Sequence, residues 1–350
     1  MMDIKLASVV ILTYNGEKTV ESCLNSVFGQ TYDNIEIIVV DNASEDRTID
    51  EVQSVERKTQ SHSAKFKIIK NDTNIGFAGH NIGIEASNGK FVLCINQDVV
   101  LEPDFIYEAV KLFQDEKVGA AQGKLISKQL TVNSKQQIID TTGIIALKSR
   151  RFIDRGQGQE DNGQYEKIEE VFGVNGAAAF FRKRCLEDVK MDSRLRGNDK
   201  GVGEFYDSDF FMYKEDIDLS WRIRLYGWKI IYCPKAVACV DRSSELVSGK
   251  SGVKEIISAR KKQSQFIGYY SFKNHRLALI KNDLLWLFFK HLPWILPREI
   301  GSWLYVLFFE PKIWPAIGKF FKQMPRAWKK RKIIMKNKRV RVKEMGRWFR

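Results

Sequence analysis

The sequence predicts an α/β protein with a mostly parallel central sheet, followed by a helical C-terminal region. Strand-like apolar runs alternate with segments of helical spacing over the first third of the chain, a pattern typical of βαβ units. Polar residues follow three of these runs directly, at Thr13, Asp41 and Asn96. From residue 284 the chain becomes rich in Trp, Phe and Leu, and from residue 319 it is dominated by Lys and Arg.

The alternating pattern defines the expected elements of the first part of the chain. Four β-rich runs predict strands at residues 7–13, 35–41, 66–70 and 91–95. Helical spacing and turn signals predict helices at residues 17–28, 48–56 and 78–87. Parallel strands end at one edge of a sheet, and ligands bind at that edge. Residues 13–15, 41–42 and 96–98 are therefore expected to form one polar crevice.

The middle of the chain predicts smaller elements. Residues 118–182 contain short strand-like runs and loops, and the small residues 176–179 either let a ligand approach the backbone or pack a strand crossing. Residues 192–203 are polar and glycine-rich, which predicts an exposed loop without a catalytic role. Residues 215–226 alternate like a strand, but acids at their start, arginines toward their end and Gly227 beyond them predict a helix.

The start of this helix carries Glu215, Asp216 and Asp218 within an aromatic and aliphatic frame. Partial burial beside like charges raises the pKa of a carboxylate, which suits it to accept a proton near neutral pH. The structural alternative is that acids in the first turn and arginines toward the end complement the helix dipole.

Length and composition indicate a folded protein. With 350 residues, 44% of them hydrophobic, the chain can form one large domain or two smaller ones. The five cysteines lie mostly in apolar runs without CxxC spacing, which favours a reducing compartment. The N-terminus runs from MMDIK directly into a strand-like segment, so no signal peptide is expected.

Positive charge is concentrated at the C-terminal end. Residues 319–350 contain 14 Lys or Arg and one acid, and so carry +13 of the net charge of +14. Such a polycation is expected to bind a polyanionic surface. In residues 284–321, charged residues interrupt every apolar window long enough to span a bilayer. Short amphipathic helices at a membrane surface are expected there, and a helical subdomain packed against the body is the alternative.

Six motifs resemble those of family-2 glycosyltransferases of the GT-A type, and more closely their bacterial rhamnosyltransferase-like branch. They are VVILTYN, IIVVDNASEDRT, NDTNIGFAGHNIGI, INQDVVLEPDF, VNGAAAFFRK and FFMYKEDIDLSWRIRLYGW. The similarity extends from about Ser8 to Ser244. It implies a GT-A nucleotide-sugar-binding fold, a divalent metal (Mg²⁺ or Mn²⁺), and a carboxylate base that forms a glycosidic bond with inversion at the anomeric carbon.

The resemblance implies that a nucleotide-sugar donor binds in the crevice at the strand ends. Asp41 would accept a hydrogen bond from the nucleotide base, and the alternative for it is an Asx-turn with Ser44. Residues 74–81 place glycines and asparagines at a helix start, where backbone N–H groups can bind phosphate. The expected donor-binding residues are Thr13, Tyr14, Asn15, Asp41, Asn42, Asn74, Gly76, Phe77, Asn81, Asn96 and Asp98.

The metal motif of the family, Asp-x-Asp or Asn-Pro-Asp, reads Asn96-Gln97-Asp98 in this chain. Asp98 is the expected metal ligand and Asn96 a neutral second ligand. The histidine that relatives commonly carry near Val240 is absent. Either Asp241 replaces it, or the metal rests on Asp98 and the phosphates of the substrate. Reduced activity or metal independence is the alternative.

Asp216 matches the general base of the family, with Glu215 beside it and Asp218 and Arg222 as supports. It would deprotonate an acceptor hydroxyl while that oxygen attacks the anomeric carbon. The resemblance extends to acceptor-binding residues, which are expected to be Gly176, Ala177, Asp218, Trp221 and Arg222.

Together these inferences predict a GT-A domain at residues 1–245, divided into a nucleotide-binding half (1–115) and an acceptor-binding half (116–245), a membrane-associating helical region (246–318) and a polybasic tail (319–350). The leading hypothesis is a cytoplasmic enzyme, peripheral at the inner face of the cell membrane, that makes cell-wall or other polysaccharide. It would transfer a sugar from dTDP-rhamnose or a UDP-sugar to a glycan or a polyprenyl-diphosphate-linked sugar.

The alternative function is a catalytically impaired nucleotide-sugar-binding protein at the membrane. An anionic membrane surface, rather than nucleic acid, is the expected partner of the tail, because the adjoining segment is rich in Trp, Phe and Leu. The sequence does not indicate an oligomeric state.

Overall fold

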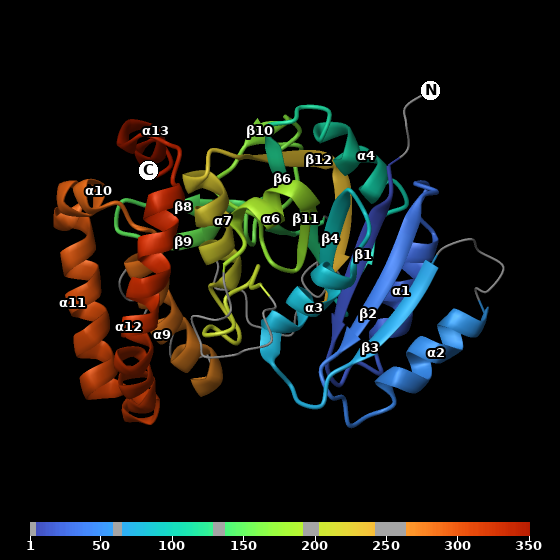
Figure 1. Cartoon of the computed structure of the whole chain (residues 1–350), viewed down its shortest axis with the longest axis horizontal. Coiled ribbons are helices and arrows are strands. Elements are labelled where there is room, and N and C mark those ends of the chain that lie inside the picture. Colours follow the sequence, from blue (N-terminus) through green and yellow to red (C-terminus); the bar gives the residue numbers. More distant parts are fainter. Residues whose placement is uncertain (1–4, 59–64, 129–136, 192–202, 242–263) are drawn as a thin grey trace.

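A ten-stranded sheet with helices on both faces forms the centre of the molecule, and the C-terminal helices pack at one end of it (Figure 1). The computed structural model describes residues 5–58, 65–128, 137–191, 203–241 and 264–350. The strand order is β10-β12-β6-β11-β4-β1-β2-β3, with β5 paired to β12 and β7 paired to β6. The loop predicted at residues 192–203 lies outside the described residues except for Gly203.

The first half of the sheet is parallel and follows the sequence pattern closely. Its strands are β1 (Ala7–Thr13), β2 (Ile35–Asp41), β3 (Lys65–Lys70) and β4 (Phe91–Asn96). Its helices are α1 (Val20–Phe28), α2 (Thr48–Lys58), the 3-10 helix η1 (Gly76–Ala78) and α3 (Gly79–Ala86). Strand β1 lies between β2 and β4, and the register pairs Thr13 with Asp41 and Leu12 with Asn96. The three polar strand ends therefore meet at one edge, as predicted.

The second half of the sheet is mixed, which corrects the expectation of a mostly parallel sheet. Its strands are β5 (Val99–Leu101), β6 (Val118–Ser127), β7 (Ile139–Thr141), β10 (Glu169–Glu170), β11 (Ala178–Arg182) and β12 (Lys229–Val240), and β8 (Ile144–Ala146) and β9 (Phe152–Asp154) form a separate hairpin. Its helices are α4 (Phe105–Leu112), α6 (Lys183–Val189) and α7 (Glu215–Leu225).

The direction of β11 contributes to this difference, together with the antiparallel pairings of β5, β7 and β10. Strand β11 runs antiparallel to both β4 and β6, and its first residue, Ala178, pairs with Ile95 near the end of β4. Hydrophobic alternation does not report strand direction, so the sequence pattern could not show this reversal. As a consequence, Gly176 and Ala177 enter the sheet at the polar edge formed by β1, β2 and β4.

Successive residues of β1 face opposite layers of the molecule, as the period of a strand requires. Val9 and Ile11 join a buried cluster that includes residues of α1, α2 and α4. Val10 points the other way and joins Ile84 of α3 and Leu219 of α7 in the second buried cluster. The result is a three-layer α/β/α core with the sheet in the middle.

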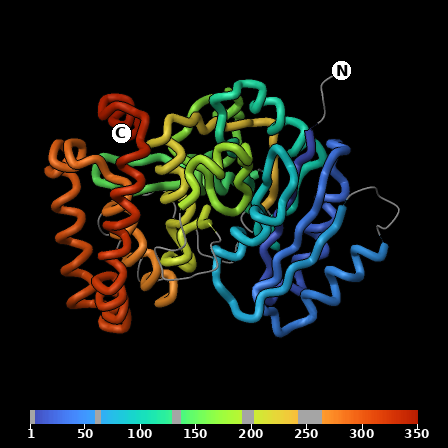
Figure 2. The backbone as a smooth tube through the Cα atoms, viewed as in Figure 1, coloured from blue at the N-terminus to red at the C-terminus, as the bar shows by residue number. Residues whose placement is uncertain are grey.

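The C-terminal helices form an ordered subdomain that packs against this core (Figure 2). They are α9 (Gln265–Asn282), α10 (Leu285–Lys290), α11 (Leu292–Phe309), the 3-10 helix η3 (Pro311–Ile313), α12 (Trp314–Asn337) and α13 (Val342–Gly346). Helix α9 packs against both α7 and α12. Residues 319–350 are therefore folded, and the border expected at residue 318 falls inside α12. The expected border at residue 245 lies outside the described residues.

Three helices of this subdomain, α9, α11 and α12, are longer than the short pieces that the sequence suggested. Helix α11 has 18 residues and α12 has 24, and both continue through an internal proline. Within the described residues, however, none of the helices combines enough length and apolar character to cross a bilayer.

Candidate active site

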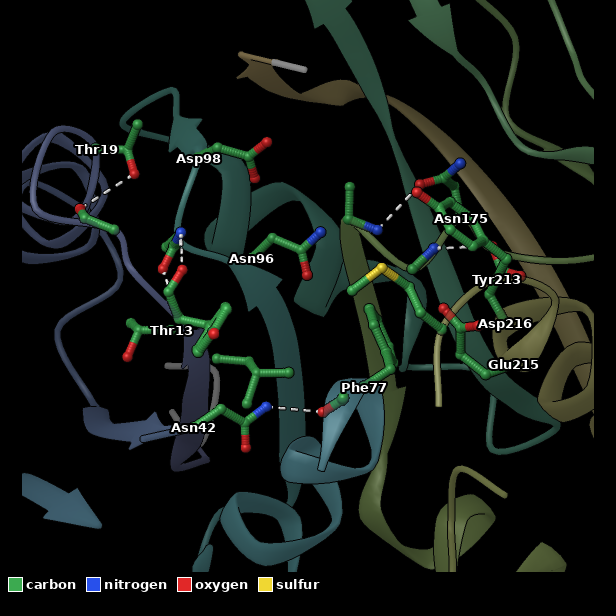
Figure 3. Close-up of a pocket in the computed structure, with 18 of the residues that line it drawn as sticks. Thr13, Thr19, Asn42, Phe77, Asn96, Asp98, Asn175, Tyr213, Glu215 and Asp216 are labelled. Atoms are coloured by element: carbon green, nitrogen blue, oxygen red, sulfur yellow. Dashed lines mark hydrogen bonds between the residues drawn. The ribbon is translucent and has the colours of Figure 1, made fainter. Parts of the chain in front are cut away.

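A cavity of about 840 Å³ lies between the carboxyl ends of β1 and β4 and the N-terminus of α7 (Figure 3). We call the part of the cavity lined by residues at the ends of β1 and β4 the strand-end side. We call the part lined by the start of α7 and by the residues just before β11 the α7 side. Of the residues selected from the sequence, it is lined by Thr13, Tyr14, Asn15, Asn42, Asn74, Gly76, Phe77, Asn96, Asp98, Gly176, Ala177, Glu215, Asp216 and Asp241. The polar strand ends and the acid cluster thus share one cavity.

The loop after β1 is fixed by contacts with Gln97. The Gln97 Oε1 accepts a hydrogen bond from the Tyr14 N–H at 2.8 Å, and its Nε2 donates to the Tyr14 carbonyl at 3.0 Å. A Cβ atom at Gly16 would collide with the Gln97 side chain. Asn15 has a left-handed backbone with φ of 48°, and its Oδ1 accepts from the Glu45 N–H at 2.8 Å. Gln97, which departs from the proline of the family motif, therefore shapes the strand-end side.

Asp41 lies beneath the cavity wall and does not line the cavity. Its carboxylate accepts hydrogen bonds from the Thr13 hydroxyl at 3.0 Å and from the Ser44 N–H and hydroxyl at 3.0 and 2.5 Å. The local turn with Ser44, which was the alternative role, is therefore present. Asn42 does line the cavity, and its Nδ2 donates to the Gly76 carbonyl at 2.8 Å.

Four other predicted ligand-binding residues also have structural positions outside the cavity lining. The Asn81 amide bonds to the backbone of Phe205 and Tyr206. Trp221 and Arg222 are fully buried on the core side of α7, and Arg222 donates to the carbonyls of Val189 and Phe205. Asp218, also fully buried, accepts hydrogen bonds from Lys281 and Asn282 of α9. The expected contact of Asp218, Trp221 and Arg222 with an acceptor is corrected by this burial.

The predicted metal ligands lie together at the strand-end side. The Asp241 N–H donates to the Asp98 carbonyl at 3.1 Å, so the two acidic residues come from adjacent backbone. Asp241 also forms an ion pair with Lys128 at 3.6 Å. Over the described ranges, no three His, Cys, Asp or Glu side chains are grouped to hold a metal. Two carboxylates with the amide of Asn96 nevertheless offer the oxygen ligands that Mg²⁺ and Mn²⁺ bind when phosphates supply the rest.

Glu215 and Asp216 begin α7 on the opposite side of the cavity from Asn96 and Asp98 (Figure 3). Burial raises the pKa of Asp216, and the positive charge of Lys214 opposes this rise. Burial and the neighbouring Asp216 charge raise the pKa of Glu215 well above its usual range. Asp216 also accepts a hydrogen bond from the Gly176 N–H at 3.3 Å. A partly buried carboxylate with a raised pKa is suited to take a proton from a hydroxyl.

Two charged residues of the α7 side were not predicted from the sequence. Lys214 precedes α7 with a left-handed φ of 73°, lines the cavity, and has its pKa lowered by burial. Asp154, the last residue of β9, also lines the cavity, and its carboxylate accepts from Asn175 Nδ2 at 2.8 Å. Lys214 stood within a recognised motif but resembled an ordinary exposed lysine, whereas no motif marked Asp154.

Comparisons with known proteins agree with the motifs in the sequence. The family model "Glycosyl transferase family 2" matches residues 8–189. Poly-beta-1,6-N-acetyl-D-glucosamine synthase of Staphylococcus epidermidis is 28% identical over 233 residues, which are 66% of this chain and 48% of that protein. The Staphylococcus aureus protein of the same name (strain COL) is 26% identical over 231 residues, 65% of this chain and 48% of that protein. The chain therefore spans about half the length of the curated relatives it matches.

Solved structures show the same fold at low sequence identity. TarS 1–349 of S. aureus in complex with UDP-GlcNAc has a TM-score of 0.55 and 18% identity, and the match covers 95% of this chain and 90% of that one. GalNAc-T7 with UDP, GalNAc and Mn²⁺ has a TM-score of 0.56 and 14% identity, with 80% and 48% covered. The GT-A-like α/β fold is thereby confirmed. Because the family model matches more than half of the chain, the protein belongs to glycosyltransferase family 2.

Proposed function

We propose that the protein is an inverting glycosyltransferase that moves a sugar from a nucleotide-sugar donor to a hydroxyl of a lipid-linked glycan during polysaccharide synthesis. The observation that carries this proposal is the position of Asp216, at a helix start within the cavity and opposite Asn96 and Asp98. The matched poly-beta-1,6-N-acetyl-D-glucosamine synthases support a role in polysaccharide synthesis. The UDP-GlcNAc complex of TarS supports a UDP-sugar as the donor, with dTDP-rhamnose as the second candidate.

In this proposal the donor lies with its nucleotide on the strand-end side and its sugar toward α7. Asp216 takes the proton of the acceptor hydroxyl, and the acceptor oxygen forms a bond to the anomeric carbon. The bond from that carbon to the diphosphate oxygen breaks, and its electron pair leaves with the nucleoside diphosphate. Attack from the face opposite the leaving group inverts the anomeric configuration. In this proposal Asp154 and Asn175, which also line the cavity, would bind other hydroxyls of the acceptor.

Asp98 and Asp241, with the Asn96 amide, would hold a divalent cation beside the diphosphate. When bound, the cation offsets the negative charge that develops on the departing diphosphate. The proton acceptor, Asp216, would act from the α7 side. Metal binding and proton transfer would therefore take place on opposite sides of the cavity.

Asp216→Asn tests this proposal. A general base contributes roughly 10² to 10⁴ in rate, so we expect turnover to fall by that factor while donor binding is retained. Donor binding would be measured as the thermal shift caused by UDP-, dTDP- and GDP-sugars with and without Mn²⁺. A variant that keeps more than a tenth of the wild-type turnover would exclude Asp216 as the base. A wild-type protein that binds a donor but shows no turnover would favour the alternative, a catalytically impaired binding protein.

We further propose that the C-terminal subdomain holds the enzyme on an anionic membrane surface. Among the described residues, 13 of the 17 exposed large apolar side chains lie on α10, α11 and α12, a concentration that marks an interaction surface. On α11, Leu296, Ile300, Leu304 and Phe308 recur every four residues and form one stripe.

Helix α12 adds exposed aromatic and cationic side chains to this subdomain. The exposed aromatic residues are Trp314, Phe321 and Trp328, and the exposed lysines include Lys319, Lys322, Lys329 and Lys332. Aromatic rings beside cations suit the headgroup region of an anionic bilayer. We define the exposed apolar residues of α10–α12 as the aromatic face. The five free cysteines fit the proposed cytoplasmic side of the membrane.

A further inference from the structure

The loop that leads into α7, residues 205–214, has an unusual backbone. Phe211, Tyr213 and Lys214 all have left-handed conformations, with φ of 63°, 68° and 73°. Non-glycine residues adopt this region at a cost of about 1–3 kcal/mol each in general, so surrounding contacts must hold them. Since Lys214 is followed by Glu215 and Asp216, the conformation of this loop sets where the proposed base lies.

Asn274 of α9 makes the contacts that hold this backbone. Its Nδ2 lies 2.8 Å from the carbonyl oxygens of Phe210, Met212 and Tyr213, which share its two N–H donors. Its Oδ1 accepts from the Lys273 ammonium at 2.5 Å, which fixes the orientation of the amide so that the donor group faces the loop. Asn274 is completely buried, so water cannot replace these hydrogen bonds.

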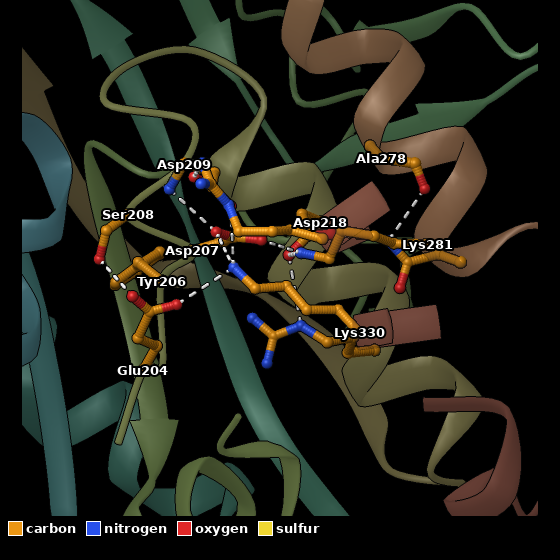
Figure 4. Close-up of polar contacts among 12 residues, drawn as sticks. Glu204, Tyr206, Asp207, Ser208, Asp209, Asp218, Ala278, Lys281 and Lys330 are labelled. Carbon is orange, nitrogen blue, oxygen red and sulfur yellow. Dashed lines mark hydrogen bonds and ion pairs between the residues drawn. The ribbon is translucent and has the colours of Figure 1, made fainter. Parts of the chain in front are cut away.

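The beginning of the loop is fixed by a buried charge cluster (Figure 4). Lys281 of α9 and Lys330 of α12 each place their ammonium 2.5 Å from a carboxylate oxygen of Asp207. Lys330 also lies 3.3 Å from Asp209, which Arg326 of α12 contacts at 2.5 Å. The C-terminal subdomain therefore forms hydrogen bonds and ion pairs with the loop near both of its ends.

The middle of the loop contacts the strand-end side of the cavity. The Phe77 N–H donates to the Phe211 carbonyl at 2.6 Å. A Cβ atom at Gly76, which has φ of 65°, would collide with that same carbonyl. A shift of the loop would thus move both Asp216 and the backbone of η1, which lines the side proposed for the donor.

We propose that Asn274 is a positioning residue that keeps the 205–214 loop, and through it Lys214 and Asp216, in the arrangement used for sugar transfer. This inference rests on the proposed function for its kinetic consequence, but the positioning itself can be measured without activity. It makes the C-terminal subdomain a part of the active site as well as a membrane contact.

Asn274→Ala tests the proposal, with Asn282→Ala as the matched control. Asn282 is on the same helix, is equally buried, and donates to Asp218 and to the Ala278 carbonyl without contacting the loop. We expect Asn274→Ala to lower the rate of UDP release from UDP-GlcNAc with Mn²⁺ by roughly 10- to 100-fold, the cost typical of a misplaced catalytic group. The Michaelis constant should change much less, and Asn282→Ala should retain the rate.

Hydrogen exchange of the peptide 208–217 provides the readout that does not depend on activity. We expect its amides to exchange roughly 10-fold faster or more in Asn274→Ala, and at the wild-type rate in Asn282→Ala, because only the first variant frees the loop. Asn274→Ser, which keeps one donor, should give an intermediate exchange rate. If this variant matches alanine, the remaining hydrogen-bond donor does not hold the loop.

Two results would overturn the inference. One is unchanged exchange of the 208–217 peptide in Asn274→Ala, and the other is an equal loss of rate in the two alanine variants, which would indicate a general effect on stability. Absence of activity in the wild-type protein would instead count against the proposed function, while the exchange result would still decide the role of Asn274.

Discussion

Lys214 and Asp154 set the charge balance around the proposed base. Burial raises the pKa of Asp216, the positive charge of Lys214 lowers it, and the negative charge of Asp154 raises it again. Glu215 lies between Lys214 and Asp216 in the chain, and burial with the Asp216 charge raises its own pKa well above the usual range. The pKa of Asp216 therefore depends on the charge of Lys214, whose own pKa is lowered by burial.

Lys214→Met should shift the acidic limb of the pH profile of kcat/KM to higher pH. The base works in its ionised form, so activity falls as the pH drops through its pKa. Removal of the Lys214 charge raises that pKa, which moves the fall to higher pH. Lys214→Arg retains the charge and serves as the control. If the acidic limb of the kcat/KM profile of Lys214→Met lies at the same pH as in the wild type, the charge of Lys214 does not affect the pKa of the titrating group.

At the scale of residues, the sequence identified the acidic cluster but did not show which of its side chains are buried. Asp216 and Asp218 are two positions apart in one acidic cluster, yet Asp216 lines the cavity and Asp218 is buried against Lys281 of α9. The turn of the helix separates them, and the lysine that decides the role of Asp218 is 63 residues away in the chain. Motif spacing could therefore identify the acidic cluster, but it could not show which of its carboxylates lines the cavity and which is buried against α9.

At the scale of elements, the aromatic face should govern attachment to membranes. Leu304 and Phe308 are 48% and 73% exposed on one stripe of α11, so Leu304→Glu with Phe308→Glu should leave the fold intact and weaken sedimentation with anionic vesicles. Ile168→Glu is the control, because Ile168 is 62% exposed but lies far from α11 in the chain. Equal sedimentation of the double variant and the control at high salt, where the lysines are screened, would refute the role of this face.

The elements themselves were predictable where periodicity reports them. The strands β1 to β4 and helix α7 appear within a few residues of their predicted bounds. The direction of the strands was not predictable from the sequence. The reversal at β11 leaves no periodic signal and becomes visible only in the antiparallel pairing of β11 with β4 and β6. That reversal is what brings Gly176 within hydrogen-bonding distance of Asp216.

At the scale of the whole molecule, the C-terminal polycation is divided between the surface and the interior. The Lys330 side chain is fully buried, with its ammonium 2.5 Å from Asp207 and 3.3 Å from Glu204. Arg339 pairs with Asp188 at 2.6 Å. Net charge computed along the sequence treats these cations as free, whereas the fold uses them to neutralise acids more than 100 residues away. Residues 319–350 therefore contact acidic residues of the body as well as solvent.

Variants of two adjacent lysines, one buried and one exposed, can distinguish the stabilising role of the basic segment from its role at the surface. Lys330→Met should lower the free energy of unfolding by about 3–5 kcal/mol, because it removes one of the two ammonium groups, those of Lys281 and Lys330, that compensate the buried Asp207 carboxylate. Lys329 is exposed, so Lys329→Met should change the unfolding free energy by less than about 0.5 kcal/mol. Denaturation in guanidinium chloride measures both values. Equal stability of the two variants would mean that the C-terminal helix is not needed to neutralise the core, and that the basic segment acts at the surface alone.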